Sequence, residues 1–222
     1  CPNGSHSFRG SGKMKIGIIG YGVVGKAASH TLSKKYKIVK FDQYAENDKF
    51  KDLEQCDFVF ITVPTPFDCD KNEVDESAVT ESLDKLEKID FVNIVIIKST
   101  VPPGACNRYS EKYNLNIVFN PEFLTERSAN FDFINQSRYI LGGNKETVKQ
   151  AADLFRWRFG KSISIIETNY ETAELIKYMN NCFFATKVSF MNEMYRVAEK
   201  SDVDWGQAVS GFVTDGRIGH TH

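Results

Sequence analysis

The chain has 222 residues, of which 41% are hydrophobic and 26% are charged, and its formal net charge is −1. This is the composition of an ordinary soluble globular protein, with room for one large domain or one domain with an appendage. The small net charge argues against a nucleic-acid partner, which needs a basic excess to contact phosphates. No apolar run approaches the roughly 20 residues of a membrane helix, so we expect no membrane partner either.

The cysteines argue against a disulfide framework and against a zinc site. There are five, at positions 1, 56, 69, 106 and 182, and no C-x-x-C pair occurs. We therefore expect no metal and reduced thiols, which favour a cytoplasmic protein. Residues 1–12 are polar and pattern-free, and Gly4-Ser5-His6 is typical of a cloning remnant, so we treat them as a leader outside the fold.

From Lys15 onward, short apolar runs alternate with amphipathic stretches. The runs predict strands at 15–19, 37–41, 58–63, 93–97, 116–119, 138–142 and 162–166. The stretches between them predict helices at 23–34, 75–88, 104–113 and 145–159. Continuously apolar strands alternating with helices indicate an α/β fold: a Rossmann-type, doubly wound and mostly parallel sheet over residues 13–166.

A long central helix is expected next, over residues 167–202. Thr168-Asn169-Tyr170-Glu171 matches a capping box, and no Gly or Pro follows until Gly206. Two apolar stripes run along this segment: Ile176, Met179 and Phe183, then Phe184, Val188, Met191, Tyr195 and Ala198. Two stripes indicate two packing partners, the first domain and either a further domain or a second subunit. We expect a homodimer through this helix, with residues 203–222 beginning a truncated substrate domain.

A cofactor signal lies between the first predicted strand and helix. Gly20-Tyr21-Gly22-Val23-Val24-Gly25 is a GxGxxG motif in the strand–turn–helix context that it requires. The first Gly permits a tight turn, the second lets a pyrophosphate approach the backbone, and the third allows close packing. The anion would then lie on free N–H groups at the helix N-terminus.

Asp42 ends the second predicted strand. A carboxylate at this place can accept both ribose hydroxyls and repel a 2′-phosphate, so the cofactor that we predict is NAD rather than NADP. The alternative is a glycine-rich turn without a ligand beside a surface aspartate.

Three further motifs each follow a predicted strand, at the sheet edge where such folds bind ligands. They are Thr62-Val63-Pro64-Thr65-Pro66, Lys98-Ser99-Thr100-Val101-Pro102-Pro103-Gly104 and Asn120-Pro121-Glu122-Phe123-Leu124-Thr125-Glu126. In this order they resemble the UDP-glucose/GDP-mannose dehydrogenase family. Glu174-Leu175-Ile176-Lys177 with Asn181 resembles that family's central-helix signature, and Arg217-Ile218-Gly219 resembles the start of its substrate loop.

The resemblance covers residues 14–222 and implies an enzyme that oxidises a nucleotide sugar, UDP-glucose to UDP-glucuronate, by two hydride transfers to NAD. It implies that Thr65 and Thr100 line the nicotinamide end of the cofactor groove, with Pro66 and Ser99 beside them. Glu126 would lie near both the cofactor and the sugar. Supply of uronic acid precursors for surface polysaccharide is the biological role that it implies.

The resemblance also implies the catalytic residues, with Thr100 among them, and the substrate-binding residues. Glu122 would act in acid–base catalysis through water, and Phe123 and Leu124 would hold the sugar nucleotide. Lys177 would stabilise an oxyanion and Asn181 would help to fix the intermediate, both also binding substrate with Glu122. Arg217 would contact the sugar, sometimes from the neighbouring subunit. Without the resemblance, Lys177 is more simply a solvated helix lysine and Arg217 an ordinary loop charge.

The family's catalytic cysteine, which traps the aldehyde, lies in a Gly-Phe-Gly-Gly-x-Cys segment after the Arg-Ile-Gly motif. The sequence ends at His222, before such a segment. We therefore expect a truncated chain that binds NAD but does not complete the oxidation. Three alternatives stay open: a relative acting on GDP-mannose or a UDP-N-acetylhexosamine, a hydroxyacid dehydrogenase of the 6-phosphogluconate type, and a non-catalytic NAD-binding dimerisation module.

Overall fold

The computed structural model describes residues 13–45, 48–124, 127–134, 136 and 138–219. The predicted leader, residues 1–12, and Glu126 lie outside these residues. The chain divides into two compact units, the first ending at Leu175 and the second beginning at Ile176. Within the described ranges, no helix combines the length and the apolar character that a membrane crossing requires.

The first unit is built on a seven-stranded sheet with the order β2-β1-β3-β6-β7-β8-β9. Its strands are β1 (Lys15–Ile19), β2 (Lys37–Phe41), β3 (Phe58–Ile61), β6 (Ile94–Ile97), β7 (Asn116–Phe119), β8 (Tyr139–Gly143) and β9 (Ile165–Thr168). All neighbouring strands are parallel except β7 and β8. This confirms the predicted doubly wound, mostly parallel sheet.

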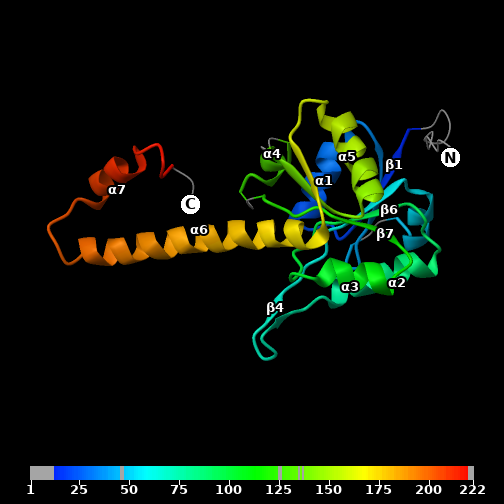
Figure 1. Cartoon of the computed structure of the whole chain (residues 1–222), viewed down its shortest axis with the longest axis horizontal. Coiled ribbons are helices and arrows are strands. Elements are labelled where there is room, and N and C mark those ends of the chain that lie inside the picture. The colour runs from blue at the N-terminus through cyan, green and yellow to red at the C-terminus, as the bar shows by residue number, and fades with distance from the viewer. Residues whose placement is uncertain (1–12, 46–47, 125–126, 135, 137, 220–222) are drawn as a thin grey trace. The chain divides into compact units, whose positions relative to one another are not determined.

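Helices cover both faces of this sheet. They are α1 (Val23–Ser33), α2 (Ser77–Lys88), α3 (Ala105–Lys112), α4 (Ala129–Ile134) and α5 (Lys145–Phe159). Helices α1 and α5 lie on one face, and α2 and α3 lie on the other (Figure 1). Every residue of β3 and β6 is consequently buried, which is why both strands are apolar throughout.

The strand order places a ligand-binding crevice at one point of the sheet. From β1 the chain crosses to β2 on one side, then returns to β3 on the other side of β1. The loops at the carboxyl ends of β1 and β3 therefore diverge, and open α/β sheets bind ligands in the crevice that results. The GxGxxG turn and the described parts of the three motifs after β3, β6 and β7 begin at this edge.

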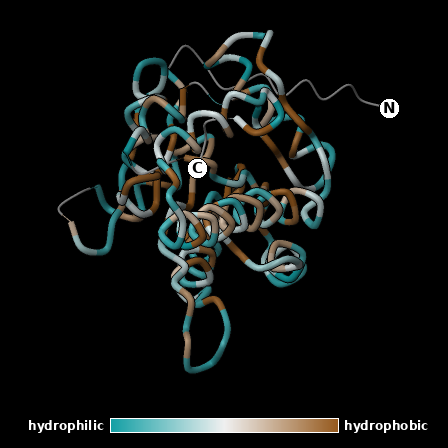
Figure 2. The backbone as a smooth tube through the Cα atoms, turned by 90° about the vertical axis from the view of Figure 1, so that its left-hand side faces the viewer, coloured by the Kyte–Doolittle hydropathy of each residue, from teal (hydrophilic) through white to brown (hydrophobic). Residues whose placement is uncertain are grey.

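Several short elements were not predicted from the sequence. They are a 3-10 helix (Phe50–Gln55), the hairpin of β4 (Phe67–Asp68) and β5 (Glu73–Val74), helix α4, and helix α7 (Trp205–Val213). The hairpin projects from the first unit as a mostly hydrophilic loop (Figures 1 and 2). These short elements are mixed in composition, so no continuous apolar run marks them as it marks β3 and β6.

The long predicted helix is α6 (Tyr170–Ala198), but the predicted capping box is wrong. Thr168 is the last residue of β9 and pairs with Gly142 of β8. The cap is Asn169, whose side-chain oxygen accepts the N–H of Thr172 at 2.9 Å. Because the backbone of Thr168 belongs to the sheet, the next residue with a side-chain acceptor begins the helix.

Candidate cofactor site

The turn between β1 and α1 has the geometry of an anion-binding loop. Gly20 has φ +88, a left-handed conformation that favours glycine, and its N–H donates to the carbonyl of Phe41 at 2.9 Å. The Thr62 hydroxyl donates to the Gly20 carbonyl at 2.7 Å. The turn is therefore held from both neighbouring strands, β2 and β3.

The other two glycines of the motif have opposite surroundings. A Cβ at Gly25 would lie 2.1 Å from the carbonyl oxygen of Gly20, so this position is closed to any side chain. A Cβ at Gly22, the N-cap of α1, would meet nothing within 4 Å. The structure thus has open space where the motif brings a pyrophosphate to the helix N-terminus.

Asp42 follows β2 and faces this turn. One carboxylate oxygen accepts the N–H of Tyr21 at 2.6 Å and the other accepts the N–H of Tyr44 at 2.9 Å. These contacts orient the carboxylate at the end of β2 beside the turn. The Lys40 ammonium lies 4.9 Å from the Tyr21 ring centroid. Burial alone would raise the pKa of Tyr21, but its hydrogen bond to Ser29 and the Lys40 charge together lower that pKa.

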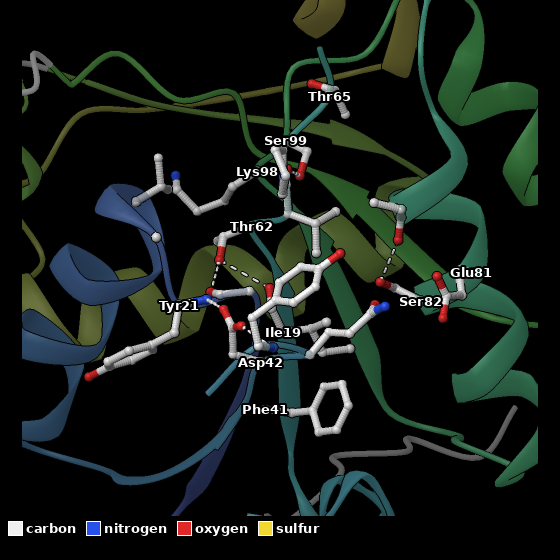
Figure 3. A pocket seen from close by; sticks show the side chains of 18 of the residues that line it. Ile19, Tyr21, Phe41, Asp42, Thr62, Thr65, Glu81, Ser82, Lys98 and Ser99 are labelled. Carbon is white, nitrogen blue, oxygen red and sulfur yellow. Dashed lines mark hydrogen bonds between the residues drawn. The ribbon is translucent and has the colours of Figure 1, made fainter. Parts of the chain in front are cut away.

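A cavity of about 640 Å³ runs from this turn across the carboxyl edge of the sheet. Figure 3 shows Phe41 and Asp42 at one end and Thr65 and Ser99 at the other. Ten of the predicted site residues line it: Gly20, Tyr21, Gly22, Val23, Val24, Asp42, Thr65, Ser99, Thr100 and Glu122. The fold therefore brings together residues from the connections that follow five strands, β1, β2, β3, β6 and β7.

Hydroxyl groups join the two loops at the far end of the cavity. Thr65 donates to the carbonyl of Thr100 at 2.6 Å, and Ser99 donates to the carbonyl of Val63 at 2.7 Å. Each bond links the loop after β3 to the loop after β6. These two hydrogen bonds therefore fix the Thr65 and Ser99 side chains, and hold the two loops together.

Glu122 lies in the loop after β7 and is only 9% exposed. It accepts the N–H of Leu124. The base of this loop is fixed by Asn120, whose side chain accepts from the Lys98 ammonium at 2.9 Å and donates to the carbonyl of Ile140 at 2.8 Å. A buried lysine thus stabilises the loop that carries the Glu122 carboxylate into the cavity.

The remaining predicted residues lie elsewhere. Pro66 precedes the hairpin, where its carbonyl accepts the N–H of Asp75 at 2.8 Å. Phe123 contacts the Arg138 guanidinium at 5.2 Å, and Leu124 packs against the core. None of these three, nor Gly25, is among the described residues that line the cavity.

The other three predicted site residues belong to the second unit: Lys177, Asn181 and Arg217. Lys177 and Asn181 lie on α6, four residues apart, and Arg217 pairs with Asp215 at 2.6 Å. Their contribution to the same site stays a prediction.

Sequence reasoning missed several residues of the cavity. The cavity is also lined by Phe41, Phe50, Ser77, Glu81, Ser82 and Lys85. Most of these belong to α2, and nothing in the sequence says which face of that helix borders the crevice. Lys98 carries a weak signal in the sequence: it directly follows a wholly apolar strand, where a lysine that is buried needs a polar partner.

The four cysteines that the structure describes are all free thiols, and two of them are buried. Burial raises the pKa of the Cys56 thiol to about 12. Burial, followed by the neighbouring Glu174 carboxylate, raises the pKa of the Cys106 thiol well above its ordinary value. Because the thiolate is the nucleophile, neither of these two cysteines is suited to covalent catalysis.

A left-handed glycine turn, an open helix N-terminus and a carboxylate at the end of β2 define a dinucleotide-binding protein of the Rossmann class. Comparison with known proteins identifies the family. Residues 39–157 match the NAD binding domain of the UDP-glucose/GDP-mannose dehydrogenase family, and residues 171–222 match its central domain. The chain therefore belongs to this family, and its cofactor is NAD.

Three similar proteins illustrate the relation. UDP-glucose 6-dehydrogenase of Rickettsia typhi is 36% identical over an alignment of 198 residues that covers 81% of this chain and 45% of that protein. The enzyme of the same name from Campylobacter jejuni is 31% identical, over 93% of this chain and 61% of that protein. A solved UDP-glucose dehydrogenase from Pyrobaculum islandicum shares the fold, with a TM-score of 0.82 at 24% identity, over 95% of this chain and 59% of that one. The chain thus spans about half the length of these relatives.

Proposed function

We propose that this chain supplies the NAD-binding and central portions of a nucleotide-sugar dehydrogenase that oxidises UDP-glucose to UDP-glucuronate. The observation that carries the proposal is the meeting of Asp42, Thr65, Thr100 and Glu122 on one cavity, in a chain of this family. The sugar is proposed as glucose because the relatives from Rickettsia typhi and Campylobacter jejuni are named as UDP-glucose 6-dehydrogenases.

The parts of NAD can be assigned in order along the cavity, beginning at α1. The N-terminus of α1, with Gly20, Gly22 and the residues up to Gly25, would bind the pyrophosphate. Asp42 would accept the ribose hydroxyls, while Thr65, Ser99 and Thr100 would form the nicotinamide end. Pro66, which is not among the described lining residues, is proposed at this end from the resemblance alone. Bound NAD supplies the hydride acceptor, and the protein supplies orientation and charge. Glu126 is proposed near both ligands from the resemblance alone.

At the reacting carbon, the buried Glu122 carboxylate would accept the proton of the alcohol, directly or through water. Phe123 and Leu124 would hold the sugar nucleotide. Lys177 and Asn181, one helical turn apart on α6, would stabilise the negative oxygen and fix the intermediate, and Arg217 would bind the sugar. A nucleophilic cysteine from the family's Gly-Phe-Gly-Gly-x-Cys segment would complete this set.

Turnover by the natural protein that contains this chain tests the proposal. NADH formation would be followed with UDP-glucose, GDP-mannose and a UDP-N-acetylhexosamine in parallel. We expect two NADH per UDP-glucose and little with the other two. A higher kcat/KM on GDP-mannose or the acetylhexosamine would reassign the substrate. NAD binding without turnover of any of the three would favour a non-catalytic module.

Three further proposals concern the domain boundaries, the oligomeric state and the cellular role. The domain organisation that we propose is an NAD-binding domain over residues 13–166, a central helix over 167–202 and the start of a substrate domain over 203–222. A homodimer through α6 is supported by its exposed apolar side chains, among them Met179, Phe183 and Phe190. We also propose a cytoplasmic enzyme that supplies uronic acid precursors for polysaccharide synthesis.

A further inference from the structure

Glu174 is a fully buried carboxylate that the proposed function does not use. It lies in the second turn of α6, within the first unit. One of its oxygens accepts the N–H of Gly104 at 2.6 Å, and the other accepts the N–H of Cys106 at 2.9 Å. Both partners lie about seventy residues earlier in the chain, at the start of α3.

The Glu174 carboxylate caps the N-terminus of α3, which has no capping side chain of its own. Gly104 has φ +86 and carries no side chain, so no N-cap side chain accepts the first N–H donors of the helix. The Ala105 N–H donates to the Pro102 carbonyl at 3.0 Å, and Glu174 accepts the N–H groups on either side of it. An anion at a helix N-terminus is also favoured by the helix dipole. A buried charge that accepts two backbone N–H groups is strongly held in place, because a lost contact leaves the charge unsatisfied.

The loop between β6 and α3 joins this contact to the cavity. Ser99 and Thr100 line the cavity at the start of the loop, and Gly104 ends the loop at Glu174. Pro102 and Pro103 lie between them, and each proline fixes its own φ. A stiff segment therefore connects the Glu174 carboxylate with the Thr100 carbonyl, which accepts the hydroxyl of Thr65.

We propose that Glu174 is a positioning residue for the nicotinamide end of the cofactor groove. It is not among the described residues that line the cavity, so it acts by holding the end of the loop that carries Ser99 and Thr100. The inference rests on the proposed assignment of those two residues to the nicotinamide. Without the anchor, the loop has to be ordered when the cofactor binds, and that ordering weakens binding.

Titration calorimetry of the chain with NAD and with ADP-ribose separates this role from a general structural one. ADP-ribose lacks the nicotinamide ring, so it engages the α1 turn and Asp42 but does not depend on the loop. In Glu174→Gln the amide keeps the shape, but its NH₂ faces one of the two N–H donors. We expect about tenfold weaker NAD binding and ADP-ribose affinity within about twofold of wild type.

Glu171→Gln is the matched control. Glu171 lies on the same helix and accepts the side-chain amide of Asn107 on α3, but its contact is exposed and touches no loop N–H. We expect this variant to bind both ligands as the wild type does. Equal weakening of NAD and ADP-ribose in Glu174→Gln, or no weakening of either, would overturn the positioning role and leave the proposed function intact. A wild-type chain that binds neither NAD nor ADP-ribose would overturn both the positioning role and the proposed function.

Hydrogen exchange on the wild-type chain tests the same coupling if Glu174→Gln does not fold. Linkage requires that a ligand favoured by the anchored loop also stabilises the anchor. We expect NAD to slow exchange of the Gly104 and Cys106 amides more than ADP-ribose does. Identical exchange at these two amides with the two ligands would contradict the inference.

Discussion

Gly22 and Gly25 of the β1–α1 turn have different reasons to be glycine. Gly25 is required by the protein itself, since a Cβ there would meet the Gly20 carbonyl oxygen at 2.1 Å and the Thr62 hydroxyl oxygen at 2.8 Å. Gly22 has φ −72, which any residue adopts, and open space around its Cα. We therefore expect its role to be to leave room for a ligand.

The two glycines should give opposite results when each is replaced by alanine. Gly25→Ala should lower the free energy of unfolding by roughly 2 kcal/mol or more, because its neighbours are backbone and move little. Gly22→Ala should keep wild-type stability but weaken NAD binding by about tenfold or more, because the methyl group blocks the pyrophosphate. Urea unfolding and calorimetry would measure the two effects. A Gly22→Ala chain that binds NAD normally would contradict this account of the turn.

Cys56 should make the first unit sensitive to alkali. Burial, then the nearby Asp57 carboxylate, raises the pKa of this thiol in the folded chain from 9.0 to about 12. Between these values the unfolded chain has lost the proton and the folded chain keeps it. The unfolded state then binds fewer protons, so stability falls as pH rises above 9. Cys56 alone should account for about 1 kcal/mol by pH 10.

Denaturant unfolding at pH 8 and pH 10 measures this loss. Cys56→Ala should show a smaller fall between the two pH values than the wild type. The exposed Cys69 provides the control, and Cys69→Ala should show the wild-type fall. Equal falls in all three chains would contradict the assigned cause.

The site was predictable where a motif marks the end of a strand and unpredictable where a helix face borders the crevice. The GxGxxG turn and the residues after β3, β6 and β7 come from local patterns, and the fold brings them onto one cavity. Glu81 and Lys85 reach the same cavity from α2, whose sequence reads as an ordinary amphipathic helix. Their place depends on the helix rotation, which packing decides.

Among the secondary-structure elements, the start of α6 shows how one residue decides a boundary. Thr168 and Asn169 both have side chains that can cap a helix, and the sequence pattern favoured Thr168. The β8–β9 pairing retains Thr168 in the sheet, so Asn169 makes the capping bond. Long strands and helices were predictable because they repeat an apolar pattern, whereas such boundaries depend on tertiary pairing.

Replacing each of these two residues tests which one caps the helix. Asn169→Ala should lower the free energy of unfolding by about 1 kcal/mol, the usual loss of an N-cap side chain. Thr168→Ala removes no capping bond and should cost clearly less. A larger loss of unfolding free energy in Thr168→Ala than in Asn169→Ala would show that Thr168 caps the helix, as the capping box predicts.

At the scale of the whole molecule, the second unit exposes more apolar surface than a solvated helix needs. Phe183 and Met179 are 62% and 60% exposed, and Phe190 and Val197 are also exposed. Contiguous apolar surface of this kind usually binds another protein surface. A second copy of the chain is the partner that we propose.

Light scattering at micromolar concentration should give twice the mass of one chain. Phe183→Glu places a charge within the proposed interface and should give the mass of one chain. Glu193→Gln changes an exposed residue of the same helix without adding a charge to the apolar stripe and should remain dimeric. A wild-type chain that is monomeric at this concentration would contradict the dimer.

The central claim is that the cavity at the carboxyl edge of the sheet binds NAD through Asp42. Calorimetric titration of the chain with NAD, with NADP as the comparison, tests it most directly. We predict micromolar to sub-millimolar NAD binding, much weaker NADP binding, and about tenfold or greater loss of NAD affinity in Asp42→Ala. Equal affinity for NAD and NADP, or NAD binding that Asp42→Ala leaves unchanged, would contradict it.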